Sequence, residues 1–121
     1  MAAEVMASFR VFKPHLTGAV LSGTADIYTP IRLQLFADTP EEVLYELMEK
    51  HIPWKEGDCV VEYANGLSTR RPLFSFQAAE TEIELLILPT LDQRNPPINP
   101  IDGRPEKGAS LAKIEVLLKQ R

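Results

Sequence analysis

The segment from Asp38 to His51 constrains the fold more than any other part of the sequence. Thr39 can cap a helix, Pro40 suits the first helical position, and Glu42 completes a capping box. Four apolar side chains then recur at helical spacing on one face, namely Val43, Leu44, Leu47 and Met48. The residue before Pro53 resists the helical conformation. The sequence therefore predicts an amphipathic helix over residues 40–51 that packs this face on a sheet.

Alternating apolar residues on both sides of this helix predict the sheet. Ile31, Leu33 and Leu35 alternate with more polar neighbours, which is typical of a half-buried strand. Residues 81–88 form a second such run, with Ile83, Leu85 and Ile87 expected inward and Glu82 and Glu84 outward. Leu86 and Leu88 make the far half of that run apolar on both sides, so we expect cover on both faces there.

A hairpin is predicted between these two strands. Asn65-Gly66 separates two β-prone runs, and both residues tolerate the positive φ angles of a tight turn. The first run is expected over residues 59–63, after a turn at 56–58. The return strand should begin at Leu67 and be interrupted at Pro72, because proline lacks a ladder donor.

The two ends of the chain are less regular. Residues 1–7 are expected to form a flexible tail, and Phe9–Phe12 a short strand. Residues 110–120 fit both a strand and a helical stripe, and their alternation favours the strand. The prediction is a single α+β domain over residues 8–121 with one mixed or antiparallel sheet of about five to six strands. The order of its elements is β-grasp-like.

Composition limits the function classes. The net charge of the 121 residues is −4, without the basic stripe of a nucleic-acid binder, so we do not expect a nucleic-acid partner. No apolar run approaches the ~20 residues that cross a bilayer, and no secretory signal is recognisable, so the expected location is cytoplasmic. With one cysteine and two histidines, no metal or other cofactor is predicted.

Two catalytic arrangements compete with simpler interpretations. Cys59 and His51 would need to meet in space, and a buried, inert thiol is the commoner outcome. Glu82 and Glu84, with Asp58 and Lys113 nearby in the sheet, would suit a divalent metal ion of a hydrolase or nuclease. Charged side chains on a solvent-facing strand explain the same residues, and this interpretation is favoured.

The stretch from residue 89 to 109 is a proline-rich loop longer than a simple connection requires. Arg94, Pro97 and Pro100 match an Arg-x-x-Pro-x-x-Pro ligand for aromatic grooves. The expected interaction residues are Arg94, Pro96, Pro97, Ile98, Pro100 and Arg104 in this loop, together with Trp54. Trp54 fits equally a side chain that covers the core.

The sequence therefore favours a small non-enzymatic protein-interaction or assembly module. It would act through a sheet edge and the loop at 89–109, with a protein partner and with itself as a homo-oligomer, most simply a dimer. The alternative is a metal-dependent hydrolase or nuclease that uses the acidic strand residues Asp58, Glu82 and Glu84.

Overall fold

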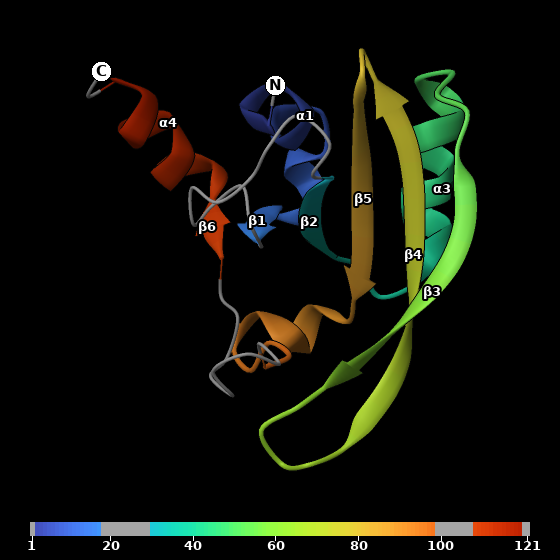
Figure 1. Cartoon of the computed structure of the whole chain (residues 1–121), viewed down its shortest axis with the longest axis vertical. Coiled ribbons are helices and arrows are strands. Elements are labelled where there is room, and N and C mark those ends of the chain that lie inside the picture. Colours follow the sequence, from blue (N-terminus) through green and yellow to red (C-terminus); the bar gives the residue numbers. More distant parts are fainter. Residues whose placement is uncertain (1, 18–29, 99–107, 120–121) are drawn as a thin grey trace.

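The computed structural model describes residues 2–17, 30–98 and 108–119. Within these residues the chain forms one mixed six-stranded sheet and three α-helices, which confirms the predicted α+β class (Figure 1). The strands are β1 (His15–Thr17), β2 (Ile31–Phe36), β3 (Lys55–Glu62), β4 (Ser68–Ala78), β5 (Thr81–Leu88) and β6 (Ala109–Ser110). The helices are α1 (Ala2–Ser8), α3 (Pro40–Glu49) and α4 (Leu111–Lys119), with 3-10 turns η1 (Arg10–Phe12) and η2 (Thr90–Gln93).

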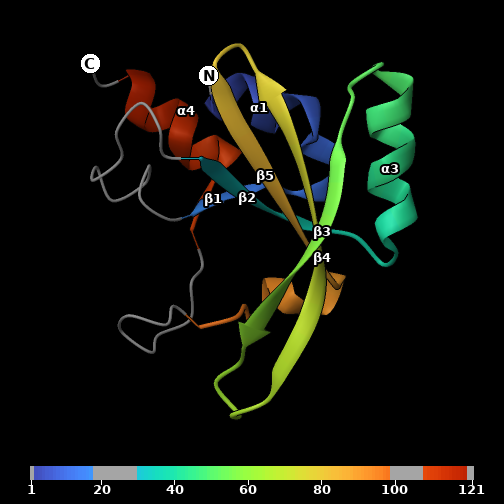
Figure 2. The same cartoon turned by 45° about the vertical axis from the view of Figure 1, so that its right-hand side comes forward.

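The strand order across the sheet is β3-β4-β5-β2-β1-β6. β2 and β5 run parallel at the centre, from the pair Ile31–Ile83 to the pair Phe36–Leu88, and the other neighbours are antiparallel. The β-grasp-like order stays a prediction. The β3–β4 hairpin extends well beyond the other strands at one end (Figure 2). β3 is the first strand in this order, so it forms one outer edge of the sheet.

The two faces of the sheet differ in what covers them. On the first, which we call the helix face, Leu33, Leu35 and Leu85 are fully buried in a core shared with α1, α3 and α4. On the second, the loop face, a smaller apolar cluster includes Leu86 and Leu88. The predicted cover on both sides of the end of β5 is confirmed.

Helix α3 begins as predicted and packs largely as predicted. The backbone N–H of Thr39 donates to Oε2 of Glu42 at 3.0 Å, one half of the capping box. Val43 and Leu47 are fully buried, whereas Met48, predicted inward, is 54% exposed. The apolar stripe is thus narrower than expected, because Met48 lies at its outer margin.

The N-terminal residues are helical rather than a tail followed by a strand. Ala2–Ser8 forms α1, and residues 10–12 form the turn η1. A helix of seven residues has little stability of its own. Met6 and Phe9 are fully buried in the main core, and this packing orders the segment.

The predicted turn at 56–58 and the predicted break at Pro72 are both absent, because β3 and β4 pair continuously from Lys55–Ser75 to Glu62–Ser68. Pro72 lies one residue beyond Leu73, the last residue of β4 that pairs with β5. One side of β4 is therefore unpaired at the proline, where a missing N–H costs no ladder hydrogen bond.

The last segment is helix α4, with only Ala109 and Ser110 in a strand. Oγ of Ser110 accepts a hydrogen bond from the Lys113 backbone N–H at 3.3 Å, which satisfies one free donor of the first turn. Ile114 is buried against the main core. Helical packing therefore prevails over the alternating pattern. No helix among the described residues is long and apolar enough to cross a membrane.

Candidate functional site

The outer edge of β3 leaves a row of backbone groups open. The Tyr63 N–H donates to the Leu67 carbonyl at 2.9 Å, so this pair of the hairpin is hydrogen-bonded. Hydrogen-bonded pairs alternate along an antiparallel ladder with pairs that are not hydrogen-bonded. The N–H and C=O groups of Glu56, Asp58 and Val60 therefore point away from β4. No segment within the described ranges pairs with them.

The chain itself closes the far end of this edge. The Ile98 N–H donates to the outward carbonyl of Glu62 at 2.8 Å. Pro96 and Pro97, just before it, are buried, and Pro97 lines a hollow on the loop face together with Arg32 and Leu86. The proline-rich segment thus meets the sheet edge at Glu62.

The side chains beside the open backbone groups are mainly acidic. Glu56, Asp58, Val60 and Glu62 all lie on the helix-face side of β3, because alternate residues of a strand share a face. Asp58 pairs with Arg70 of β4 at 2.9 Å. Glu56 accepts a hydrogen bond from Nε1 of Trp54 at 3.4 Å.

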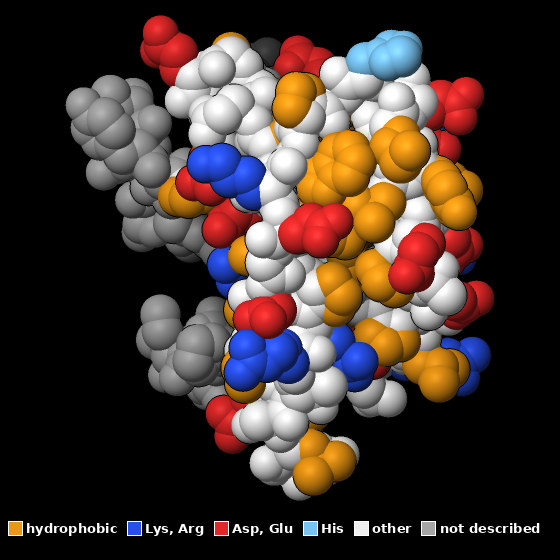
Figure 3. All heavy atoms as spheres, turned by 90° about the vertical axis from the view of Figure 1, so that its right-hand side faces the viewer, with side chains coloured by type: hydrophobic (Ala, Val, Ile, Leu, Met, Phe, Trp, Pro, Cys, Tyr) orange, Lys and Arg blue, Asp and Glu red, His pale blue; other side chains and the backbone are white. Residues whose placement is uncertain are grey.

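A groove of about 410 Å³ runs between this edge and helix α3. Its apolar lining includes Leu44 of α3 and Pro72 and Phe74 of β4, while Glu41 and Glu56 contribute carboxylates. Figure 3 shows hydrophobic side chains gathered on this side of the molecule, with acidic side chains among them. The groove combines an apolar floor with a charged rim, on which the carboxylates of Glu41, Glu56 and Asp58 outnumber the basic Arg70 and Arg71.

A second hollow, of about 340 Å³, lies at the start of β3. Trp54, Lys55 and Phe76 are among its lining residues. β4 continues past its last β3 partner, Ser75, to Ala78, so its final residues are unpaired on that side in the described structure. The open edge therefore continues from β3 onto the end of β4.

The predicted interaction residues lie in several different places. Trp54 is half-buried against the main core and stands at the start of the open edge. Ile98 closes the other end of the edge, whereas Arg94 is exposed beyond η2. Pro100 and Arg104 lie outside the described residues. In this conformation the buried Pro97 is not available to an aromatic groove.

The sequence did not single out Glu56 or Val60. The signal is present, since acidic residues at positions 56, 58 and 62 alternate with Gly57, Cys59 and Val61. The glycine and acidic residues around Gly57 are typical of a turn, and the sequence therefore predicted a turn at 56–58 instead of a strand.

The residues of the hydrolase alternative do not converge. Glu84 is on the loop face, where Arg32 contacts it at 3.2 Å, and Asp58 is on the helix-face side with Arg70. No group of three His, Cys, Asp or Glu side chains among the described residues is placed to hold a metal ion. Cys59 is on the loop-face side, opposite α3 and the adjoining His51.

Polar side chains form a network on the loop face. The Tyr63 hydroxyl donates to Oδ2 of Asp92, and Nε of Arg71 donates to the same hydroxyl at 3.0 Å. Burial, together with the Asp92 carboxylate, raises the pKa of Tyr63. This network ties η2 to the hairpin and so holds the segment that leads to Ile98.

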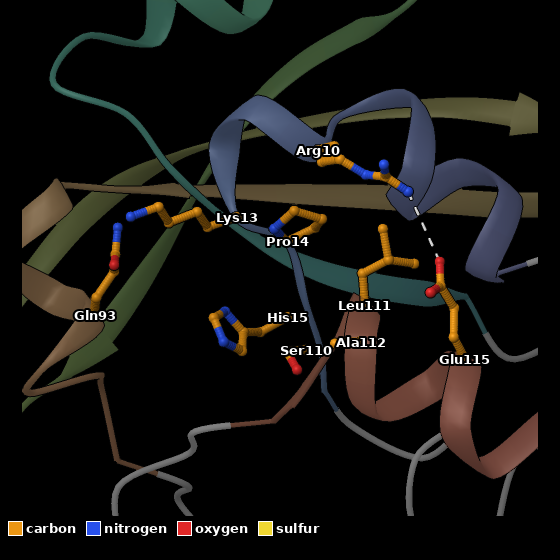
Figure 4. A pocket seen from close by; sticks show the side chains of 9 residues that line it. All are labelled: Arg10, Lys13, Pro14, His15, Gln93, Ser110, Leu111, Ala112 and Glu115. Carbon is orange, nitrogen blue, oxygen red and sulfur yellow. Dashed lines mark ion pairs between the residues drawn. The ribbon is translucent and has the colours of Figure 1, made fainter.

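A separate hollow of about 560 Å³ lies between η1, β1 and α4 (Figure 4). Lys13 and Gln93 extend toward each other at one end of it, and Arg10 pairs with Glu115 at 3.7 Å at the other. Burial lowers the pKa of His15, partly offset by the Lys13 backbone carbonyl, and the imidazole meets Phe36 edge-on at 5.4 Å. Among the described residues that line the hollow, Ser110 carries the one hydroxyl, and its Oγ caps α4.

No family model, curated protein or solved structure matches the chain.

Proposed function

We propose that the protein is a non-enzymatic interaction module that takes up an extended segment of a partner protein as an additional strand on β3. The observation that carries this proposal is the open row of backbone groups at Glu56, Asp58 and Val60. Backbone hydrogen bonds supply affinity in strand addition, and pockets for alternate side chains supply specificity. The groove between β3 and α3, and the hollow lined by Trp54, would serve as such pockets.

The proline-rich segment limits the length of the β3 edge that is open to a partner strand. Because Ile98 already occupies the carbonyl of Glu62, an incoming strand would align with residues 55–61. The cytoplasmic location and the homodimer expected from the sequence stay predictions. No contact among the described residues favours the hydrolase alternative.

The test is selection of peptides from a random twelve-residue library on the full chain, followed by amide hydrogen exchange of the complex. Selected peptides should protect the outward amides of Glu56, Asp58 and Val60. Val60→Pro removes one outward donor that the hairpin does not use, so binding should weaken. Val60→Thr keeps the donor and is the matched control.

Two outcomes would overturn the proposal. The library could yield no binder, or the selected peptides could leave the three outward amides exchanging freely while protecting another part of the chain. The amides of the hairpin pairs in Val60→Pro should remain protected, which separates loss of binding from loss of fold.

A further inference from the structure

The surface around the open edge carries an excess of negative charge. Residues 38–62, which include α3 and β3, contain eight acidic and two basic side chains, a net charge of −6, whereas the whole chain carries −4. Lys50 pairs with Glu46 at 3.4 Å and Arg70 with Asp58. Glu41 and Glu56, which line the groove beside β3, have no ion pair with a described residue. An incoming strand would thus meet carboxylates.

This charge pattern opposes a second copy of β3 as the added strand. In a two-fold antiparallel pair of identical edges, residues equally far from the centre face each other. Centring the pair on Asp58 sets that residue against itself, and centring it on Cys59 sets Glu56 against Glu62. Registers centred on Gly57 or Val60 likewise oppose two acids. Like charges directly opposite are destabilising.

On the loop-face side, the same edge presents smaller and less polar residues. Gly57, Cys59 and Val61 alternate with the acids, and Val61 is buried in the second apolar cluster. A Cβ atom placed on Gly57 would lie 3.7 Å from the Leu73 carbonyl oxygen, which is an ordinary van der Waals contact. The loop-face side of Gly57 therefore has room for a side chain. Apolar partner side chains would suit this side.

We infer that the strand taken up by β3 alternates lysine or arginine with apolar residues. The inference rests on the proposed function. The basic side chains face α3, where their aliphatic stems cover Leu44 and Phe74 and their charged ends reach Glu41 and Glu56. The apolar side chains face the loop side. The partner is therefore a segment of another protein with this alternation, rather than a second copy of the chain.

The experiment compares three ten-residue peptides with the full chain by NMR titration. Valine alternates with lysine in the first, with threonine in the second and with glutamate in the third. The lysine peptide should bind at the edge, protecting the amides of Glu56, Asp58 and Val60, and about tenfold more tightly than the threonine peptide. Glutamate should abolish binding, and added salt should weaken the lysine complex.

Two variants of the chain test whether the preference for a basic peptide depends on the carboxylates beside β3. Glu56→Lys should weaken binding of the lysine peptide about three- to tenfold and improve binding of the glutamate peptide. Glu80→Lys makes the same charge change in the exposed β4–β5 turn and is the control, expected to leave both affinities nearly unchanged.

The outcomes separate this inference from the proposed function. Equal binding of lysine and threonine peptides at the three amides would overturn the basic partner and retain strand addition. Binding of none of the peptides at those amides would count against both. Concentration-dependent protection of the same amides without peptide would identify a second copy as the occupant and overturn the inference.

Discussion

The backbone N–H of Ile98 donates to the carbonyl of Glu62 across 2.8 Å, although the two residues are far apart in the sequence. This contact brings the proline-rich segment to the outermost strand of the sheet. It occupies one outward group of β3 and leaves those of Glu56, Asp58 and Val60 open. The bond therefore sets the length of edge that a partner strand can use.

Replacing Ile98 with proline should remove this donor. The free energy of unfolding is expected to fall by about 0.5–1.5 kcal/mol, the usual net value of one hydrogen bond, plus any loss of side-chain packing. Ile98→Val keeps the N–H and most of the apolar surface and is the control. Urea denaturation measures both variants, and equal stability would mean that the bond contributes nothing in solution.

His51, the residue after the C-cap of α3, is in the left-handed conformation, with a φ of 56°. Its N–H donates to Met48 and that of Ile52 to Leu47, which is the Schellman pattern. Because a side chain at positive φ is strained, His51→Gly should stabilise the fold by about 1 kcal/mol. His51→Ala retains the strain and should not stabilise. Thermal or urea denaturation of the two variants is the measurement, and stabilisation by alanine equal to that by glycine would contradict this explanation.

Leu47 and Met48 are neighbours on α3 with opposite environments. Leu47→Ala should lower the free energy of unfolding by about 2–5 kcal/mol, because it opens a cavity in the main core. Met48→Ala, at an exposed position, should change it by less than about 0.5 kcal/mol. A loss below about half a kcal/mol for Leu47→Ala would show that this face of α3 does not pack on the sheet.

Stability should fall as the pH is lowered from about 7.5 to 5. Burial lowers the pKa of His15, so the unfolded chain takes up a proton near the ordinary value of 6.5 while the folded chain resists it. The stabilising effect of the neutral imidazole is complete above that value and is lost as the pH drops. In His15→Gln the same decrease should be smaller. Parallel urea titrations at the two pH values test this, and identical decreases would exclude His15 as a source.

Local signals in the sequence predicted the elements whose cause is local. The Thr39–Glu42 capping box and the Asn65-Gly66 turn act within a few residues, and both the helix and the hairpin are present. The extent of β3 was not predictable in this way. Gly57 favours a turn by composition, but pairing with Leu73 across the hairpin holds it in a strand.

The candidate site was only partly accessible from the sequence. Trp54 and Ile98 were predicted as interaction residues, and the structure places them at the two ends of the open edge. The outward orientation of Glu56 and Val60 depends on which pairs of the ladder are hydrogen-bonded. Single-residue properties carry no information about that alternation.

The parallel pairing of β2 with β5 has a consequence for how the chain folds. Arg32 and Glu84 contact each other although they are 52 positions apart in the sequence, so the centre of the sheet depends on contacts of high sequence separation. Such contacts form late, because closing a long loop costs entropy before the pairing is gained. The β3–β4 hairpin pairs residues much closer in sequence and can form earlier. During synthesis, the strand with the open edge would therefore be available to a partner before the central strands have joined.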